Sequence, residues 1–301
     1  MDPVLRREVV NKRALLVRLV PTGRLVSAVA LALSPIFMVA GCKRGSMPSS
    51  SSATITGIVT DSTGAVLSEV HVLAGSAATT TGRNGTFLLA VDPQSALVVA
   101  LSKAGYLESS KGVVATAGTT SRVAAALMAM AAPVTLDATT GGSVTGDRGA
   151  SLTAGPGVLV DTRGSPVRGP VEVSLTPLSP AIPGELAAYP GALVGSYHSG
   201  APVPLRTFGM LDVTVTQNGR LLQVAAGKTV AVTIPVADPP GRRAASDTYP
   251  KTEGLWSFNL ATAIWDHEGL ARLVGSTYEA QLSHFGFHSI GEEIHRVFYV
   301  P

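Results

Sequence analysis

The sequence predicts an all-β protein made of short antiparallel strands in two successive sandwich domains. Three observations support this prediction. The 301 residues include 32 glycines and 20 prolines, a composition that favours turns over long helices. Short runs alternate apolar and polar residues, which is typical of strands with one buried face. Asn84-Gly85 and Asn218-Gly219 each lie between two such runs, and Asn-Gly favours tight turns between strands.

Residues 1–42 have the pattern of an export signal. An apolar run from Leu25 to Gly41 follows a basic segment. A membrane-spanning helix needs about 20 apolar residues, whereas this run is shorter and is interrupted by Ser34-Pro35. We therefore expect a signal that is cleaved rather than a permanent transmembrane anchor. The basic residues of the segment are Arg6, Arg7, Lys12, Arg13, Arg18 and Arg24.

Cys42 is the only cysteine of the chain, so it has no partner for an intramolecular disulfide. One cysteine also falls short of the several ligands that a structural zinc site requires. The alternatives are a lipidation site, a buried free cysteine, or a residue beside an ordinary cleavage site.

The sequence Val39-Ala40-Gly41-Cys42 resembles the lipobox of bacterial lipoproteins. The resemblance implies cleavage before Cys42, a diacylglyceryl thioether on its sulfur, and acylation of the new amino group. Two acyl chains anchor a protein stably, whereas one chain does so only marginally. Lys43 stands where an Asp would retain an enteric lipoprotein in the inner membrane, so the resemblance implies an outer-membrane location.

The remainder of the chain gives further expectations about partners. Residues 43–53 are rich in serine and indicate a flexible tether. The segment 1–42 contains six of the 23 basic and two of the 20 acidic residues, which leaves 17 basic and 18 acidic residues and a net charge of −1. Without a basic stripe, we expect no nucleic-acid partner. The expected partners are the membrane, through the lipid, and a protein or glycan at the cell envelope.

The first predicted domain covers residues 54–131. Its first strand places Ile55, Gly57 and Val59 on one face and ends at a turn containing Gly64. Val70 and Val72 alternate with polar residues in the next strand, and 96–102 form a buried strand. The alanine-rich segment at 121–131 fits a helix by propensity alone.

These residues resemble the carboxypeptidase regulatory-like domain. The matching positions are Gly57, Val59, Asp61, Gly64, Val70, Val72, Thr81, Asn84, Gly85, Phe87 and the sequence Lys-Ala-Gly-Tyr at 103–106. The resemblance implies a seven-strand transthyretin-like sandwich, an accessory module without chemistry of its own, and a strand rather than a helix at 121–131.

The second predicted domain, at 132–301, is a larger antiparallel β-sandwich. Val171, Val173 and Leu175 share one face of a strand, and residues 230–236 alternate in the same way. The order of motifs resembles the β-rich domain of cartilage intermediate layer proteins. The departure begins after His284-Phe285, so the fold of the C-terminal segment is left open.

We expect no catalytic residues, no metal site and no cofactor. Related domains with His-Phe-Ser cleave their own backbone through the serine hydroxyl, but Gly286 offers no such nucleophile. The sequence has no His-Glu-x-x-His motif. In a regular strand His284 and His288 would lie about 13 Å apart, too far to share a metal ion.

Trp256, Trp265 and Tyr189 are the candidate ligand-binding residues. A hairpin turn between Leu260 and Ala261 would place the two tryptophans opposite each other, on the face of Phe258. Such a pair is usually a core contact, while exposed indoles would form a platform for sugar rings. Asp137, Asp147 and Asp161 are expected to be solvated turn residues because they lack the spacing of a calcium loop.

Three functional hypotheses follow. The first is a lipid-anchored, non-catalytic binding or scaffolding protein of the cell envelope, and the second is a carbohydrate-binding surface protein. The third is an enzyme of an unrecognised type, which would need clustered ionisable groups that sequence spacing does not reveal.

Overall fold

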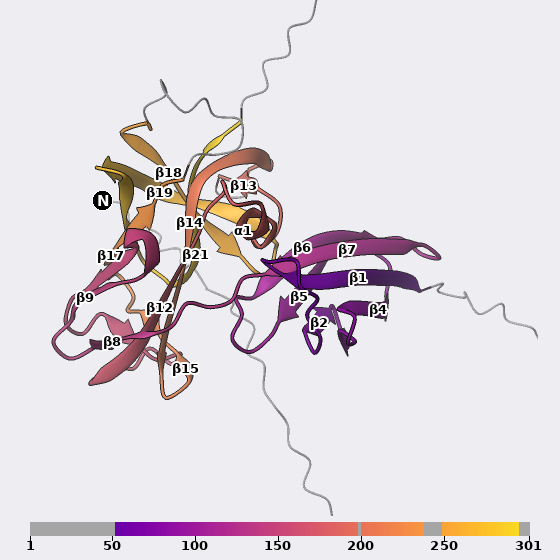
Figure 1. Ribbon diagram of the computed structural model, residues 1–301, viewed down its shortest axis with the longest axis horizontal. Helices are drawn as coiled ribbons and strands as arrows, with labels where there is room; N and C mark the ends of the chain where they lie inside the picture. The colour runs from indigo at the N-terminus through magenta and orange to yellow at the C-terminus, as the bar shows by residue number, and fades with distance from the viewer. Residues whose placement is uncertain (1–51, 198–199, 238–248, 295–301) are drawn as a thin grey trace, which may run out of the picture. The chain divides into compact units, whose positions relative to one another are not determined.

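The computed structural model describes residues 52–197, 200–237 and 249–294 (Figure 1). The predicted signal, Cys42 and nearly all of the tether lie outside the described residues. Strands dominate the described chain, which confirms the all-β prediction. The helical segments are α1 (Pro183–Ala187) and the 3₁₀ turn η1 (Asp147–Gly149). No helix among the described residues is long and apolar enough to cross a membrane.

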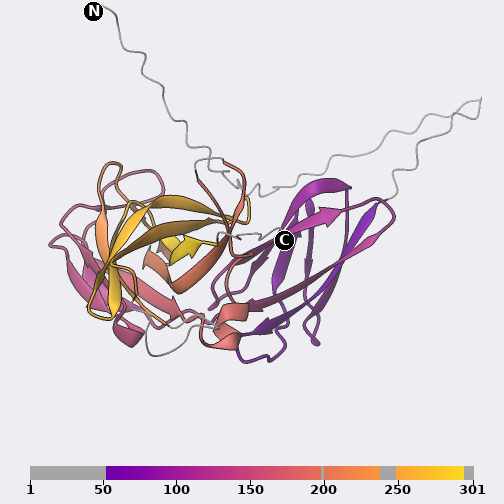
Figure 2. The same cartoon turned by 90° about the horizontal axis from the view of Figure 1, so that it is seen from above.

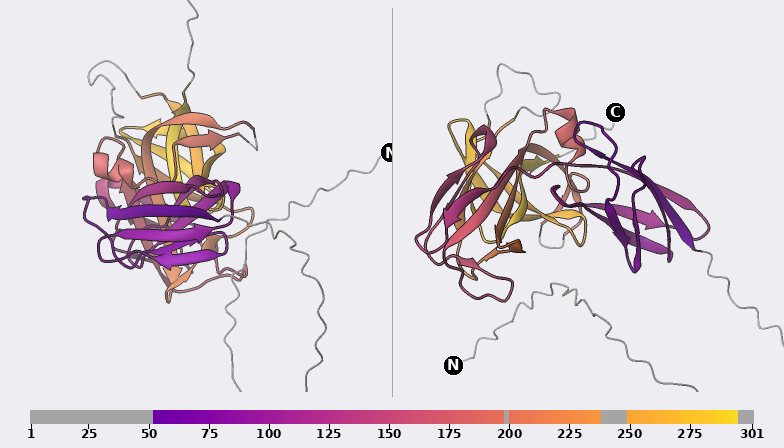
Figure 3. Two further views of the ribbon diagram at one scale, coloured as in Figure 1. Left: turned by 90° about the vertical axis from the view of Figure 1, so that its right-hand side faces the viewer. Right: turned by 60° about the horizontal axis from the view of Figure 1, so that its bottom comes forward.

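The first domain contains seven strands in two sheets. One sheet has the order β4-β1-β7 and the other has the order β3-β2-β5-β6. All pairs are antiparallel except β1 and β7, which run parallel. The strands are β1 (Ala53–Asp61), β2 (His71–Ala74), β3 (Ala77–Thr80), β4 (Thr86–Val91), β5 (Gln94–Ser102), β6 (Ser109–Ala115) and β7 (Thr120–Leu127). Figure 3 shows the sheets of this domain face on in its left panel.

The alternation in the sequence accounts for the core of this domain. Ile55 and Val59 are fully buried, as are Val72 of β2 on the facing sheet and Val70 directly before β2. Position 57, between Ile55 and Val59, is a glycine because the ring of Phe87 occupies the space where a Cβ would lie. The segment at 121–131 is a strand through Leu127, because its pairing with β1 outweighs the helix propensity of alanine.

The second domain is built on one long, curved sheet. Its path is β8-β12-β14-β21-β18-β19-β20-β17-β10-β9, and β13 and β15 pair beside it. The two end strands of this path, β8 and β9, lie side by side, so the sheet curls around a shared apolar core (Figures 1 and 2). β11 and β16 form a separate two-stranded sheet.

The bounds of the strands in the second domain are as follows. They are β8 (Val134–Asp137), β9 (Gly142–Thr145), β10 (Ser151–Ala154), β11 (Leu159–Val160), β12 (Pro170–Leu178), β13 (Val194–Ser196), β14 (Val203–Gln217), β15 (Arg220–Leu221), β16 (Gln223–Val224), β17 (Val230–Pro235), β18 (Thr252–Asn259), β19 (Ile264–Val274), β20 (Thr277–Leu282) and β21 (Gly286–Glu293).

Several local predictions for this domain are confirmed. Val171, Val173 and Leu175 of β12 face the core. Asn218 and Gly219 both have positive φ angles, of 51° and 73°, and form the turn between β14 and β15. The C-terminal segment that the sequence left open forms β21 as far as Glu293, paired with β14 and β18.

Candidate functional site

Glu268, His284 and His288 form a cluster in the second domain. One potential metal-binding atom of each residue lies within 4.8 Å of those of the other two. Glu268 belongs to β19, His288 belongs to β21, and His284 lies in the connection between β20 and β21. Three segments that are separate in the sequence therefore bring their side chains to one place.

A β-bulge determines the direction of Glu268. Leu255 pairs with Gly269 but Trp256 pairs with His267, so Glu268 is an extra residue in β19. Without the bulge, Glu268 would lie opposite Trp256 and share its face. His267 takes that place and its ring lies 4.9 Å from the Trp256 ring. Glu268 instead turns to the opposite face, where the hydroxyl of Ser257 donates a hydrogen bond to its Oε1 at 2.6 Å. Bulges often redirect one side chain in this way.

A bend in the backbone brings the two histidines together. His284 precedes β21, and Gly286 has a φ of 127°, which favours glycine. The two imidazole rings have their centroids 5.0 Å apart. The expectation of about 13 Å was wrong because it assumed a regular strand from 284 to 288.

Hydrogen bonds orient both rings. The Nδ1 atom of His288 lies 3.1 Å from the carbonyl oxygen of Gly286, and the Nδ1 atom of His284 lies 3.2 Å from that of Phe285. A carbonyl oxygen only accepts, so each Nδ1 carries the donated proton. The Nε2 atoms consequently point towards Glu268, at 2.5 Å from Oε1 for His284 and 4.0 Å from Oε2 for His288.

The three residues differ in burial. The side chain of His288 is 0% exposed, while those of His284 and Glu268 are 32% and 22% exposed. The cluster therefore has one end in the core and one at the surface. The Nε2 atom of His288 is buried and has no hydrogen-bond partner.

The environment favours neutral His288 and ionised Glu268. Burial lowers the pKa of the His288 imidazole to about 4, with a further lowering by His284 and an opposing effect of Glu268. Burial also acts to raise the pKa of Glu268, but a hydrogen bond from His284, which donates through Nε2 when its ring carries both protons, and one from Ser257 outweigh it and hold that pKa below its ordinary value. A neutral imidazole and a carboxylate are the forms that bind metal ions.

The three residues predicted to bind ligand are all buried. Trp256, Trp265 and Tyr189 are 1%, 0% and 2% exposed. Their polar atoms donate to backbone oxygens: Trp256 Nε1 to Gly291, Trp265 Nε1 to Ala192, and the Tyr189 hydroxyl to Leu178. The prediction of core contacts is confirmed for the tryptophans, and the exposed aromatic platform is not formed.

The register of the tryptophan hairpin also differs from the prediction. Trp265 pairs with Phe258 and Trp256 pairs with His267, because residues 260–263 form a longer loop than expected. Ala263 adopts a φ of 56° at the end of this loop. The shared face is nevertheless correct, since both indoles and Phe258 belong to one buried cluster. That cluster also contains Tyr189, and Lys111 Nζ donates to the Tyr189 carbonyl oxygen at 2.9 Å.

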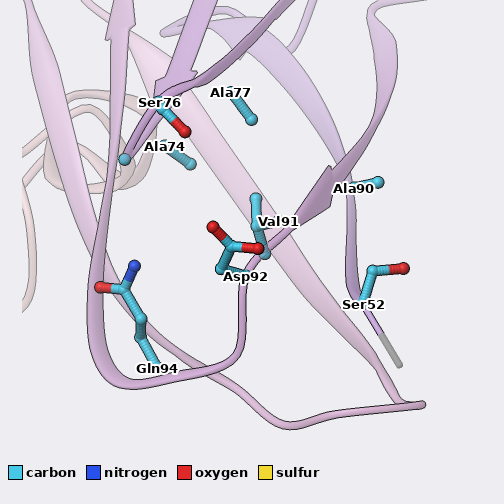
Figure 4. Close-up of a pocket in the computed structure, with 9 residues that line it drawn as sticks. Ser52, Ala74, Ser76, Ala77, Ala90, Val91, Asp92 and Gln94 are labelled. Atoms are coloured by element: carbon cyan, nitrogen blue, oxygen red, sulfur yellow. The ribbon is translucent and has the colours of Figure 1, made fainter. Parts of the chain in front are cut away.

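Two other features contribute no chemistry. Figure 4 shows a hollow in the first domain between the end of β2, the start of β3 and the end of β4. Asp92 is the only ionisable residue among those that line it. Asp137 and Asp161 accept hydrogen bonds from the backbone of their own turns, as expected for solvated turn residues.

The comparison with protein families concerns the first domain. Residues 54–128 match the model of the carboxypeptidase regulatory-like domain. We refer to this segment below as the regulatory-like domain because of that similarity. The seven strands of the regulatory-like domain lie almost entirely within the matched residues. Domains of this type are non-catalytic. This property concerns residues 54–128 and not the second domain.

Among solved structures, the Bacillus anthracis TIE protein matches 81% of this chain at 10% identity with a TM-score of 0.25. The match covers 49% of that structure, so this chain corresponds to about half of its length. The comparison with curated proteins found no match.

The sequence drew attention to His284 and His288 but not to Glu268. The two histidines stand four residues apart in a segment where the resemblance to known families ended. Glu268 enters the cluster through a bulge, and no residue pattern in β19 marks its position. The glycines that follow Glu268 and precede Phe287 were the available signal, because Gly269 and Gly286 both have positive φ.

Proposed function

We propose that this chain is an exported lipoprotein, anchored through Cys42, that presents two β domains at the cell envelope as a non-catalytic binding or scaffolding protein. The observation that carries this proposal is the sequence Val39-Ala40-Gly41-Cys42 directly after a basic segment and an apolar run. Lys43 favours the outer membrane. Two acyl chains on Cys42 would hold the protein there stably.

The types of the two domains support a non-catalytic binding role. The regulatory-like domain is of a non-catalytic type. For the second domain, we propose a relationship to the β-rich domain of cartilage intermediate layer proteins, on the order of its sequence motifs. Binding of glycans through Trp256, Trp265 and Tyr189 loses its support because their side chains are buried.

Fatty-acid labelling tests the anchor. We expect the full chain, produced in a Gram-negative bacterium with radioactive palmitate, to carry label and to fractionate with the outer membrane. Cys42→Ala should abolish the label and the cleavage of the signal. Ser46→Ala, four residues away in the tether, is the matched control and should behave as the wild type. Lys43→Asp should retain label but move the protein towards the inner membrane.

The possible results separate the parts of the proposal. Unlabelled wild-type protein in the cytosol, with residues 1–41 still attached, would refute the lipoprotein assignment. The enzymatic alternative is favoured by one observation, the cluster of Glu268, His284 and His288. Robust hydrolysis by the purified protein that is lost in Glu268→Gln would replace the non-catalytic role by that alternative.

A further inference from the structure

We propose that Glu268, His284 and His288 bind a divalent transition-metal ion of the zinc class, through one carboxylate oxygen and the Nε2 atoms of the two imidazoles. Imidazole nitrogens and carboxylate oxygens are ordinary ligands of Zn²⁺ and related ions. This site is independent of the lipid anchor, so the two proposals stand or fall separately.

The lone pairs of both imidazoles point into the cluster. Backbone carbonyls accept from Nδ1 of both rings, which leaves each neutral imidazole with its lone pair on Nε2. Both Nε2 atoms face the carboxylate of Glu268. A hydrogen bond that fixes the non-ligating nitrogen of a histidine is a regular feature of metal sites, because it sets the tautomer and the orientation of the ring.

Hydrogen-bond acceptors outnumber donors between His284 and Glu268. His284 Nε2 and Glu268 Oε1 lie 2.5 Å apart, and with Nδ1 of His284 acting as the donor both atoms are acceptors unless a proton lies between them. Bound metal would take the place of that proton and attract both lone pairs. Metal binding to imidazole and carboxylate ligands commonly releases protons in this way.

His288 has an unpaired ring nitrogen. Its Nε2 atom is buried, has no hydrogen-bond partner and points into the cluster. An unpaired buried polar atom costs about 1 to 3 kcal/mol of stability, so its presence requires an explanation. A metal ion coordinated by this nitrogen would remove the cost.

The distances permit a shared ion after small movements. Ligands at about 2.0 to 2.2 Å from one ion lie at most about 4 Å apart. His288 Nε2 and Glu268 Oε2 are 4.0 Å apart, and the widest separation in the cluster is within 4.8 Å. The partly exposed side chains of Glu268 and His284 supply the movement, while the buried ring of His288 provides a fixed position.

The cluster resembles a metal site in which one coordination position is open to water. Three protein ligands leave at least one coordination position to water, as in catalytic rather than structural zinc sites. The partial exposure of His284 and Glu268 opens that position to solvent. Ser257 donates to Glu268 Oε1 and acts as a positioning residue for the carboxylate.

Titration with zinc tests the proposal on the full chain, purified in detergent after treatment with a chelator. Calorimetry should show one Zn²⁺ per chain, and Co²⁺ should give the visible absorption bands of low-coordinate nitrogen and oxygen ligation. Glu268→Gln and His284→Ala should each weaken zinc binding by at least about tenfold, because loss of an outer-shell partner alone costs about 10- to 100-fold. Ser257→Ala should weaken it by about tenfold.

Two variants are matched controls. His71→Ala removes an exposed histidine from the regulatory-like domain, and Glu279→Gln changes an exposed glutamate on β20. Both should bind zinc like the wild type. Circular dichroism of every variant separates loss of a ligand from loss of the fold, and Glu268→Gln keeps the shape of the side chain.

The outcomes are decisive in both directions. Loss of binding in folded Glu268→Gln or His284→Ala, with both controls unchanged, supports the site. Wild-type protein that binds no zinc, or zinc binding that remains unchanged in both ligand variants, overturns it. Normal labelling of Cys42 alongside absent zinc binding would leave the lipoprotein proposal intact.

Discussion

Asp212 and His288 are buried ionisable residues on adjacent strands, and burial acts on both in the same sense. Asp212 lies on β14, which pairs with β21, the strand of His288. A charged group is less stable in the protein interior than in water. Burial therefore raises the pKa of Asp212, to about 6, and lowers that of His288. The charge of each residue is thus more costly in the folded protein than in the unfolded chain.

Asp212 gives a prediction for the dependence of stability on pH. Burial raises its pKa to about 6, the hydrogen bond from Thr214 opposes the rise, and the Glu108 carboxylate adds to it. An unfolded aspartate titrates near 3.9, so between about pH 4 and 6 the folded state binds more protons. The contribution of Asp212 to stability is therefore largest below pH 4 and falls as pH rises through 6. Asp212→Asn should raise the free energy of unfolding at pH 7 by about 2 to 3 kcal/mol.

Urea denaturation of both proteins from pH 4 to pH 7.5 measures this effect. The difference between variant and wild type isolates Asp212 from other carboxylates, such as Asp61 and Asp161, whose pKa values are lowered by hydrogen bonds. The advantage of the variant should shrink towards pH 4. A difference that is constant with pH would contradict the assignment.

The residues of the candidate site come together through backbone geometry that their identities alone do not predict. His284 and His288 were recognisable as a pair by their spacing, but the distance between them depends on one backbone angle at Gly286. The sequence did not predict that Glu268 belongs to the cluster, because an alternating pattern assigns it to the face of Trp256. The bulge reverses that assignment, and its position follows from the pairing of the whole sheet.

At the scale of the elements, the period of two along the chain correctly predicted several strands, among them β1, β5, β12 and β17. β12 spans Pro170–Leu178 and buries Val171, Val173 and Leu175 as predicted, because alternate apolar residues need one buried face. β7 is a strand although its alanine content favours a helix, because its backbone pairs with that of β1. The tryptophan hairpin failed in register because loop length, rather than periodicity, sets which residues pair.

Gly57 gives a prediction for the sandwich of the regulatory-like domain. A Cβ at this position would lie 2.4 Å from the ring of Phe87 and 2.4 Å from the carbonyl oxygen of Val123. The backbone contact cannot be relieved by a change of rotamer. Gly57→Ala should therefore lower the free energy of unfolding by about 1 to 3 kcal/mol, measured by urea denaturation.

Gly112 on β6 is the matched control for Gly57. It also lies in a strand of this domain, but a Cβ there meets nothing within 4 Å. Gly112→Ala should change stability by no more than about 0.5 kcal/mol. Equal effects of the two substitutions would show that contact with Phe87 and Val123 is not the cause.

At the scale of the whole molecule, the proposed metal site joins two strands that are not paired with each other. β19 and β21 lie on opposite sides of β18, and each of them pairs with it. A ligand that binds only the folded state stabilises that state by mass action. Zinc should therefore act on the unfolding of the entire second domain rather than on one loop.

Thermal unfolding makes this a prediction. At a free zinc concentration of about one hundred times Kd, the stabilisation is about 2.7 kcal/mol. For a domain of this size, Tm should rise by about 5 to 10 °C. His284→Ala should show no such rise, while His71→Ala should match the wild type in differential scanning calorimetry. An equal rise in His284→Ala would place the bound zinc elsewhere.

The parallel pairing of β1 and β7 has a mechanical consequence. The ladder runs from Thr54 opposite Thr120 to Asp61 opposite Leu127, so the chain enters at one end and leaves at the other, about 25 Å away. A pull between an anchored N-terminus and a load on the second domain would act along these strands. Their hydrogen bonds would then be sheared together instead of being opened one by one, which requires a larger force.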